Sequence, residues 1–154
     1  MQFEKEFNIY IEIWEKLFKV KKFTLSLLPI FDDKLTDDLV EREKEYVRRY
    51  KKFVKAYNSF SKVLIKYKPF YNEIIYTKLV EIRKILYDEG KYFNEIKIKK
   101  TLKHSDYLFF MHNPEKVEKL EMLIMETSEM MKITLKDFKL GEYQKKNNER
   151  KSHF

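Results

Sequence analysis

The chain has 154 residues, of which 44% are hydrophobic, 16% aromatic and 38% charged, and its formal net charge is +8. It contains no Cys, which excludes disulfide scaffolds, zinc–thiolate sites and thiol catalysis. Two Gly and three Pro are too few for the many tight turns of a sheet protein of this length. The composition therefore predicts one soluble domain made of a few long helices.

Neither secretion nor membrane insertion is indicated by the sequence. Residues 1–6, Met-Gln-Phe-Glu-Lys-Glu, lack the basic and then apolar order of a secretory signal peptide. No apolar run approaches the roughly 18 residues that a membrane-spanning helix needs. We therefore expect a cytoplasmic protein that has no membrane partner.

The first predicted helix covers residues 3–28 and ends at Pro29. Its apolar side chains lie on more than one face, which is typical of a central helix or of a helix with a second face for a partner. One stripe consists of Phe3, Phe7, Tyr10, Trp14, Leu17 and Phe18, and another of Ile9, Ile13, Val20 and Leu27. Residues 29–36 are predicted to form a loop in which Asp33 or Thr36 caps the next helix.

The second predicted helix, residues 37–67, carries the strongest pattern in the chain. Its apolar side chains follow one another at alternating steps of four and three residues, which is the spacing of one seam along an α-helix. They are Tyr46, Tyr50, Phe53, Tyr57, Phe60, Leu64 and Tyr67, and Tyr71 continues the series. We expect this aromatic seam to pack into the core and Pro69 to end the helix.

Positive charge is concentrated on the opposite side of the second helix. Residues 46–103 hold 16 basic and 5 acidic residues, and no acidic residue occurs between Tyr46 and Glu73. The cations of the helix are Arg48, Arg49, Lys51, Lys52, Lys55, Lys62 and Lys66. We assign these seven residues to a candidate surface for nucleic acid or for an acidic protein, with a solvated face that keeps the protein soluble as the alternative. All of them except Arg49 form a stripe about 27 Å long, for which we expect no carboxylate partner within the helix.

The later helices are marked by proline and glycine. Pro69 is predicted to be the first residue of a third helix, and Gly90 its C-terminal cap, although Phe93 and Ile96 could continue the helix past Gly90. The basic segment 91–103 then forms a short helix or an extension of the third helix. Asn113 followed by Pro114 is a start signal for a fourth helix, whose heptad pattern continues to Gly141.

These elements together predict an all-α fold, an antiparallel four-helix bundle with a long second helix. We assign residues 1–141 to the bundle and residues 142–154, which lack periodicity, to a flexible basic tail.

A helical bundle with a basic face resembles the ribonuclease domains of the HEPN group. The signature of those domains is an Arg followed four to six residues later by a His. No Arg of this chain has a His at that distance, because Arg150 and His153 are only three residues apart. The resemblance therefore implies an architecture and no ribonuclease site.

Other catalytic motifs are absent as well. The chain has no Glu-x-x-His for a carboxylate-bound metal pair and no Gly-rich phosphate loop. A third hypothesis is an enzyme with an unrecognised site around His104, Asp106 and His112, where the two histidines could share a metal ion. We expect no catalytic residue, no metal and no cofactor.

The leading hypothesis is a non-catalytic binding protein that acts through protein–protein interaction, as an adaptor, an inhibitor or a subunit of a larger assembly. Its partner would be another protein or a second copy of the chain. The second face of the first helix and the Met-rich fourth helix, with Met122, Met125, Met130 and Met131, supply interface surface. The alternative hypothesis is a nucleic-acid-binding bundle that uses the basic side of the second helix.

Overall fold

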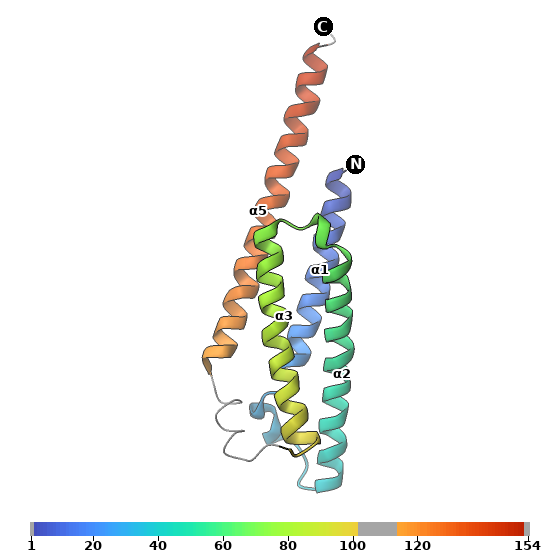
Figure 1. Cartoon of the computed structure of the whole chain (residues 1–154), viewed down its shortest axis with the longest axis vertical. Helices are drawn as coiled ribbons and strands as arrows, with labels where there is room; N and C mark the ends of the chain where they lie inside the picture. Colours follow the sequence, from blue (N-terminus) through green and yellow to red (C-terminus); the bar gives the residue numbers. More distant parts are fainter. Residues whose placement is uncertain (1, 102–113, 153–154) are drawn as a thin grey trace.

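The computed structural model describes residues 2–101 and 114–152, and this part of the chain is helical and contains no β-strand. Its long helices are α1 (Gln2–Leu25), α2 (Leu39–Lys66), α3 (Glu73–Phe93) and α5 (Pro114–Ser152). The short elements are two 3₁₀-helices, η1 (Pro29–Lys34) and η2 (Lys68–Phe70), and a π-helical turn, η3 (Asn94–Ile98). Figure 1 shows the long helices running alternately up and down, with α1 packed against both α2 and α5. The prediction of an antiparallel all-α bundle is confirmed.

The start of α2 is set by a side-chain cap that the sequence analysis did not choose. Asp38 Oδ1 accepts hydrogen bonds from the backbone N–H groups of Val40 (2.9 Å) and Glu41 (3.2 Å). The predicted caps, Asp33 and Thr36, are therefore wrong, and Asp33 lies within η1. Asp38 is the residue in extended geometry directly before the first helical turn, so its carboxylate reaches the free N–H groups there.

The third helix begins at Glu73 and not at Pro69. Asn72 Oδ1 accepts a hydrogen bond from the backbone N–H of Ile74 (2.9 Å), whereas Pro69 lies in η2. Asn72 has the side-chain acceptor that a free N–H of the new helix needs, and proline has none.

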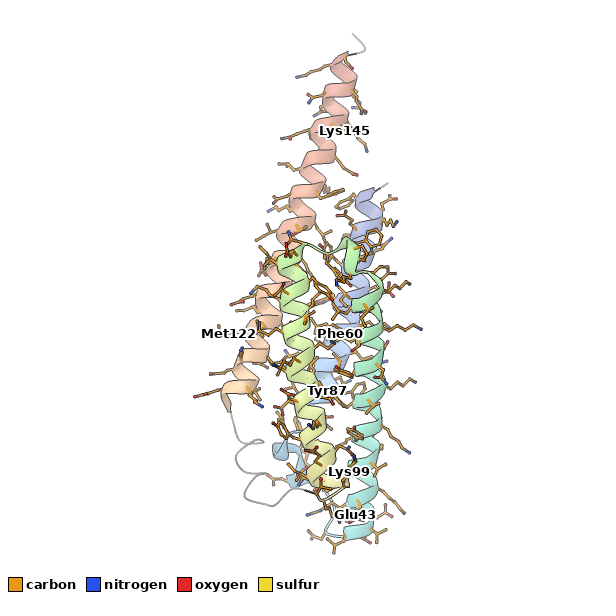
Figure 2. All side chains as sticks on the ribbon, viewed as in Figure 1. Glu43, Phe60, Tyr87, Lys99, Met122 and Lys145 are labelled. Atoms are coloured by element: carbon orange, nitrogen blue, oxygen red, sulfur yellow. The ribbon has the colours of Figure 1, made fainter. Side chains whose placement is uncertain are left out.

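The aromatic seam of α2 packs into the core, as predicted, although α2 is rotated slightly about its axis. The buried residues of α2 are Tyr46, Arg49, Phe53, Ala56, Phe60, Val63 and Leu64. Tyr50 and Tyr57 of the seam are only partly buried. If Tyr50 is placed at heptad position a, most of the buried residues occupy positions d (Tyr46, Phe53, Phe60) and g (Arg49, Ala56, Val63). Arg49 therefore faces the core. Figure 2 shows Phe60 between the helices of the bundle.

Gly90 lies inside α3, so the prediction that it caps the helix is wrong. The helix continues to Phe93, whose ring contacts the rings of Tyr46 and Tyr50 at centroid distances of 5.8 Å and 6.4 Å. A Cβ atom at residue 90 would lie 3.0 Å from Cδ1 of Phe53 and closer still to Cε1 and Cζ. Glycine is required here because the backbone of α3 passes directly over the ring of Phe53.

The last helix is longer than its heptad pattern predicts. α5 continues without a break through Gly141 to Ser152, and Figure 1 shows its C-terminal part projecting beyond the N-terminal end of α1. Near this end of α1, Phe3 stacks on Phe138 and its N–H donates a hydrogen bond to Glu142 Oε1 (3.3 Å). The division into residues 1–141 and a flexible tail of residues 142–154 stays a prediction.

The two glycines provide a matched test of the packing between α2 and α3. Gly90→Ala should lower the free energy of unfolding by about 1–3 kcal/mol because the new methyl group overpacks the core. Gly141→Ala should be neutral or stabilising by up to about 1 kcal/mol, since Ala favours a helix and, apart from the adjoining residues and backbone of α5, no described atom lies within 4 Å of the added group.

Urea denaturation of the two variants measures both effects. Adding Phe53→Leu to Gly90→Ala should recover part of the loss, because the smaller side chain can make room. Stabilisation of the protein by both glycine substitutions would show that α3 does not depend on this contact.

Candidate functional site

Most of the predicted basic surface is exposed in the structure. Lys51, Lys52, Lys55, Lys62 and Lys66 are exposed side chains of α2. In the same heptad numbering of α2, Lys52 and Lys66 occupy position c, and Arg48, Lys55 and Lys62 occupy position f. Positions c and f are neighbours on the helix surface, so these five cations form one line along α2. We call Arg48, Lys52, Lys55, Lys62 and Lys66 the cation line. It follows the flank of α2 that borders α1.

Arg48 has a carboxylate partner within its own helix, which corrects the expectation of an unpaired stripe. Its guanidinium donates hydrogen bonds to Glu45 Oε2 (2.7 Å) and Oε1 (2.5 Å). Glu45 directly precedes the segment without acidic residues, and it also accepts a hydrogen bond from Arg49. The bonds from Arg48, with a smaller contribution from Arg49, lower the pKa of Glu45 to about 2 against the opposing effect of desolvation.

Arg49 does not lie on the exposed surface to which it was assigned. Only 9% of the residue is exposed, and its guanidinium donates hydrogen bonds to Asp32 Oδ1 (3.1 Å) and to the backbone oxygen of Phe31 (3.2 Å). Lys97 of η3 forms an ion pair with the other oxygen of Asp32 (3.1 Å). Arg49 thus links α2 to η1, and Lys97 links η3 to η1. Arg49 therefore contributes to the stability of the fold.

The structure adds cations from α1 that the sequence analysis missed. Lys16 and Lys19 of α1 lie opposite Lys52 and Lys55 of α2. They line a groove of about 290 Å³, whose other lining residues are Phe23, Ala56 and Ser59. We call it the lysine groove. Within the described residues, none of its four lysines pairs with a carboxylate.

A second groove separates α1 from α5, has a volume of about 580 Å³ and is lined mainly by apolar side chains. They include Ile11, Trp14 and Phe18 from α1 and Ile124, Met125, Met131 and Leu135 from α5. We call it the apolar groove. Phe18 is 60% exposed and Met125 62%, which is unusual for large apolar residues. The second apolar face of the first helix therefore borders an open groove.

Charged residues at the rim of the apolar groove are paired with each other. Lys21 pairs across the groove with Glu121 (3.9 Å), and Lys132 pairs with Glu129 along α5 (3.0 Å). The rim consequently has no excess charge of either sign. Binding in this groove would depend on apolar contact and shape.

The methionines of α5 divide between the core and the surface. Met131 is buried and Met130 partly buried, whereas Met122 and Met125 are exposed. Figure 2 shows Met122 on the outer side of α5. Only part of the Met-rich segment therefore fills the core.

The candidate cluster of His104, Asp106 and His112 lies outside the described residues. Within residues 2–101 and 114–152, no three His, Asp or Glu side chains are grouped so that they could hold a metal ion. None of the helices in this part of the chain has both the length and the apolar character that a bilayer crossing requires.

One buried acid belongs to the interior of the bundle and to neither groove. Glu89 of α3 is 7% exposed and lines a small cavity with Thr24, Lys116 and neighbouring apolar residues. Burial raises the pKa of Glu89 above its ordinary value of 4.5, and the positive charge of Lys116 opposes this shift.

Comparisons with known proteins identify no relative of this chain. No family model matches the sequence, and no curated protein and no solved structure matches it either. The two grooves are therefore the features of the described residues from which a function can be inferred.

Arg48 and Arg49 provide a matched test of which arginine stabilises the fold. Arg49→Leu should lower the free energy of unfolding by about 3 kcal/mol, because Asp32 would keep only Lys97 as a cationic partner and the backbone oxygen of Phe31 would lose its donor. Arg48→Leu removes an exposed pair and should change it by less than about 1 kcal/mol. Urea denaturation of both variants measures the difference, and equal losses would contradict the structural role of Arg49.

The pKa of Glu89 predicts a pH-dependent stability. A raised pKa means that the folded state binds the proton more tightly than the unfolded state. The resulting cost to stability is absent below about pH 4.5 and grows as the pH rises. Glu89→Gln should therefore raise Tm at pH 8 and change it little at pH 4, as measured by thermal unfolding. The same rise at both pH values would contradict this origin, and exposed Glu15→Gln is the control.

Proposed function

We propose that the protein is a non-catalytic binding module whose apolar groove takes up an amphipathic helix of another protein. The observation that carries this proposal is the exposure of Phe18 and Met125 on facing walls of one groove. Leaving such side chains in water is costly at about 25 cal/mol per Å² of apolar surface, and a bound partner would remove that cost.

The shape of the groove suits a helical occupant. Its walls are two antiparallel helices, which contribute residues 10–21 of α1 and residues 121–135 of α5. The longer wall extends over about 21 Å at the rise of an α-helix, which corresponds to an occupant of about 14 residues. Such a helix would place apolar side chains in the groove at positions i, i+4, i+7 and i+11.

The chemistry of the groove points to apolar anchors in the partner. The charges of Lys21 and Lys132 are already satisfied by Glu121 and Glu129, so a strongly charged segment would find no complementary site. Met125 and Met131 have flexible, polarisable side chains that adapt to the shape of an apolar ligand.

Another protein fits the groove better than a second copy of the chain does. In a two-fold dimer centred on the groove, the groove would face its own copy, and two concave surfaces cannot fill each other. The remaining void would lose the dispersion contacts that stabilise an interface. The occupant therefore has to be convex, as a single helix is.

Site-specific photo-crosslinking in the native cell lysate tests this proposal. A benzoylphenylalanine at residue 18 or 125 should yield a discrete covalent product with another protein, and mass spectrometry should map the attachment to an amphipathic helix. Ile65 of α2 is the matched control, since it is 60% exposed, like Phe18, and lies outside the groove. The probe at residue 65 should not yield this product.

A second substitution in the groove supplies the specificity control. Phe18→Glu should abolish the product formed by the probe at residue 125, while Ile65→Glu should leave it unchanged. A product with twice the mass of the chain would assign the groove to self-association and overturn the proposed partner. Absence of any product beyond that of the residue 65 control would overturn the groove as a binding site.

A further inference from the structure

The lysine groove lies on the other flank of α1 and is independent of the proposed protein-binding groove. Lys16 and Lys19 face Lys52 and Lys55 across it, so two helices contribute to one concentration of positive charge. Lys62 and Lys66 extend it along α2, and Arg48 lies at the opposite end of the cation line. Like charges at this density repel one another in the free protein, and an anionic ligand would relieve that repulsion.

Nearby carboxylates of the described residues form no ion pair with the four lysines of the groove. Glu12 of α1 accepts a hydrogen bond from the hydroxyl group of Tyr67 (2.8 Å), and Tyr67 and Glu12 together raise the pKa of Lys66. Glu45, at the other end, is bound by Arg48 and Arg49. Glu15 is exposed, does not line the groove and forms no ion pair with Lys19. The lysines of the groove therefore keep their charge available for a ligand.

We infer that the lysine groove and the adjoining Lys62 and Lys66 bind the phosphate backbone of double-stranded nucleic acid, without reading its base sequence. The line from Lys52 to Lys66 is about 21 Å long at the rise of an α-helix. A duplex rises by about 3.4 Å per base pair, so the line spans about six base pairs and faces phosphates of the strands that pass along this side of the duplex.

The side-chain chemistry favours a duplex over a single strand. Except for Arg48, which is held by Glu45, every cation of this surface is a lysine, a point charge that contacts phosphate without the bidentate geometry that reads guanine. Proteins that bind single strands offer aromatic faces on which bases stack. The one aromatic residue lining the groove, Phe23, is only partly exposed and already has the ammonium groups of Lys22 and Lys52 at 6.0 Å from its ring centroid, so the groove offers no open row of aromatic faces for stacking.

Fluorescence anisotropy with a labelled 24-base-pair duplex, as DNA and as RNA, tests this inference. We expect binding at 50 mM salt, and a plot of log K against log salt with a slope of about −5 for six lysine–phosphate contacts. No binding at 50 mM salt would overturn the inference.

Two variants with the same net charge separate this site from a general effect of charge. The groove variant replaces Lys16, Lys19, Lys52 and Lys55 with Gln. It should weaken binding at 50 mM salt by at least about 100-fold and reduce the slope to about −2. The control variant replaces the exposed α5 residues Lys136, Lys139, Lys145 and Lys146 with Gln and should change affinity by less than about threefold. Equal losses in the two variants would overturn the site.

Comparing the affinity of the protein for other anionic polymers identifies the class of ligand. A single strand of the same length should bind more weakly than the duplex, and tighter binding would overturn the duplex assignment. Tighter binding of poly-glutamate than of duplex at equal salt would assign the groove to an acidic protein. Photo-crosslinking at residue 18 should be unchanged in the groove variant, so failure of one proposal does not imply failure of the other.

Discussion

The contact of Phe53 with Gly90 determines how closely α2 and α3 approach and which side of α2 faces inward. The ring of Phe53 occupies the space that a side chain at residue 90 would need. With α3 this close, Phe93 reaches Tyr46 and Tyr50 and extends the aromatic packing toward η3. The same rotation of α2 buries Arg49 and sets the cation line beside α1. One contact between two helices thus positions both the interior ion pairs and the charged surface.

Helix α1 is the wall that the two grooves share. Its core face is buried against the bundle, and its flanks differ in chemistry. Lys16 and Lys19 lie on the flank next to α2, whereas Trp14 and Phe18 lie on the flank next to α5. The apolar residues on nearly every side of this helix are therefore explained by two separate demands, packing in the core and the lining of an open groove. The apolar surface and the cationic surface thus lie on roughly opposite sides of the same helix.

The sequence predicts the four long helices and the aromatic seam well because both follow from local periodicity. It fails where a residue's role depends on a distant partner. Gly90 has the appearance of a helix cap until Phe53 is seen beneath it, and Arg49 looks like one more exposed cation until Asp32 of η1 is placed beside it. Lys16 and Lys19 look like ordinary solvated residues of α1, because nothing in their neighbourhood reveals that α2 brings two further lysines opposite them. The cap of α2 was missed because several acceptors near residue 38 suit the role equally well.

The projecting end of α5 has a consequence for hydrogen exchange of the backbone amides. A helix that lacks lateral packing is held only by its own hydrogen bonds, and in water such a segment opens locally at little cost. Amides after Glu142 should thus exchange through opening of the helix end alone. The amides around Leu120, Thr127 and Met131, which lie against α1 and α3, should exchange only when the whole bundle unfolds. One continuous helix therefore contains two regions whose protection differs by nearly the full stability of the protein.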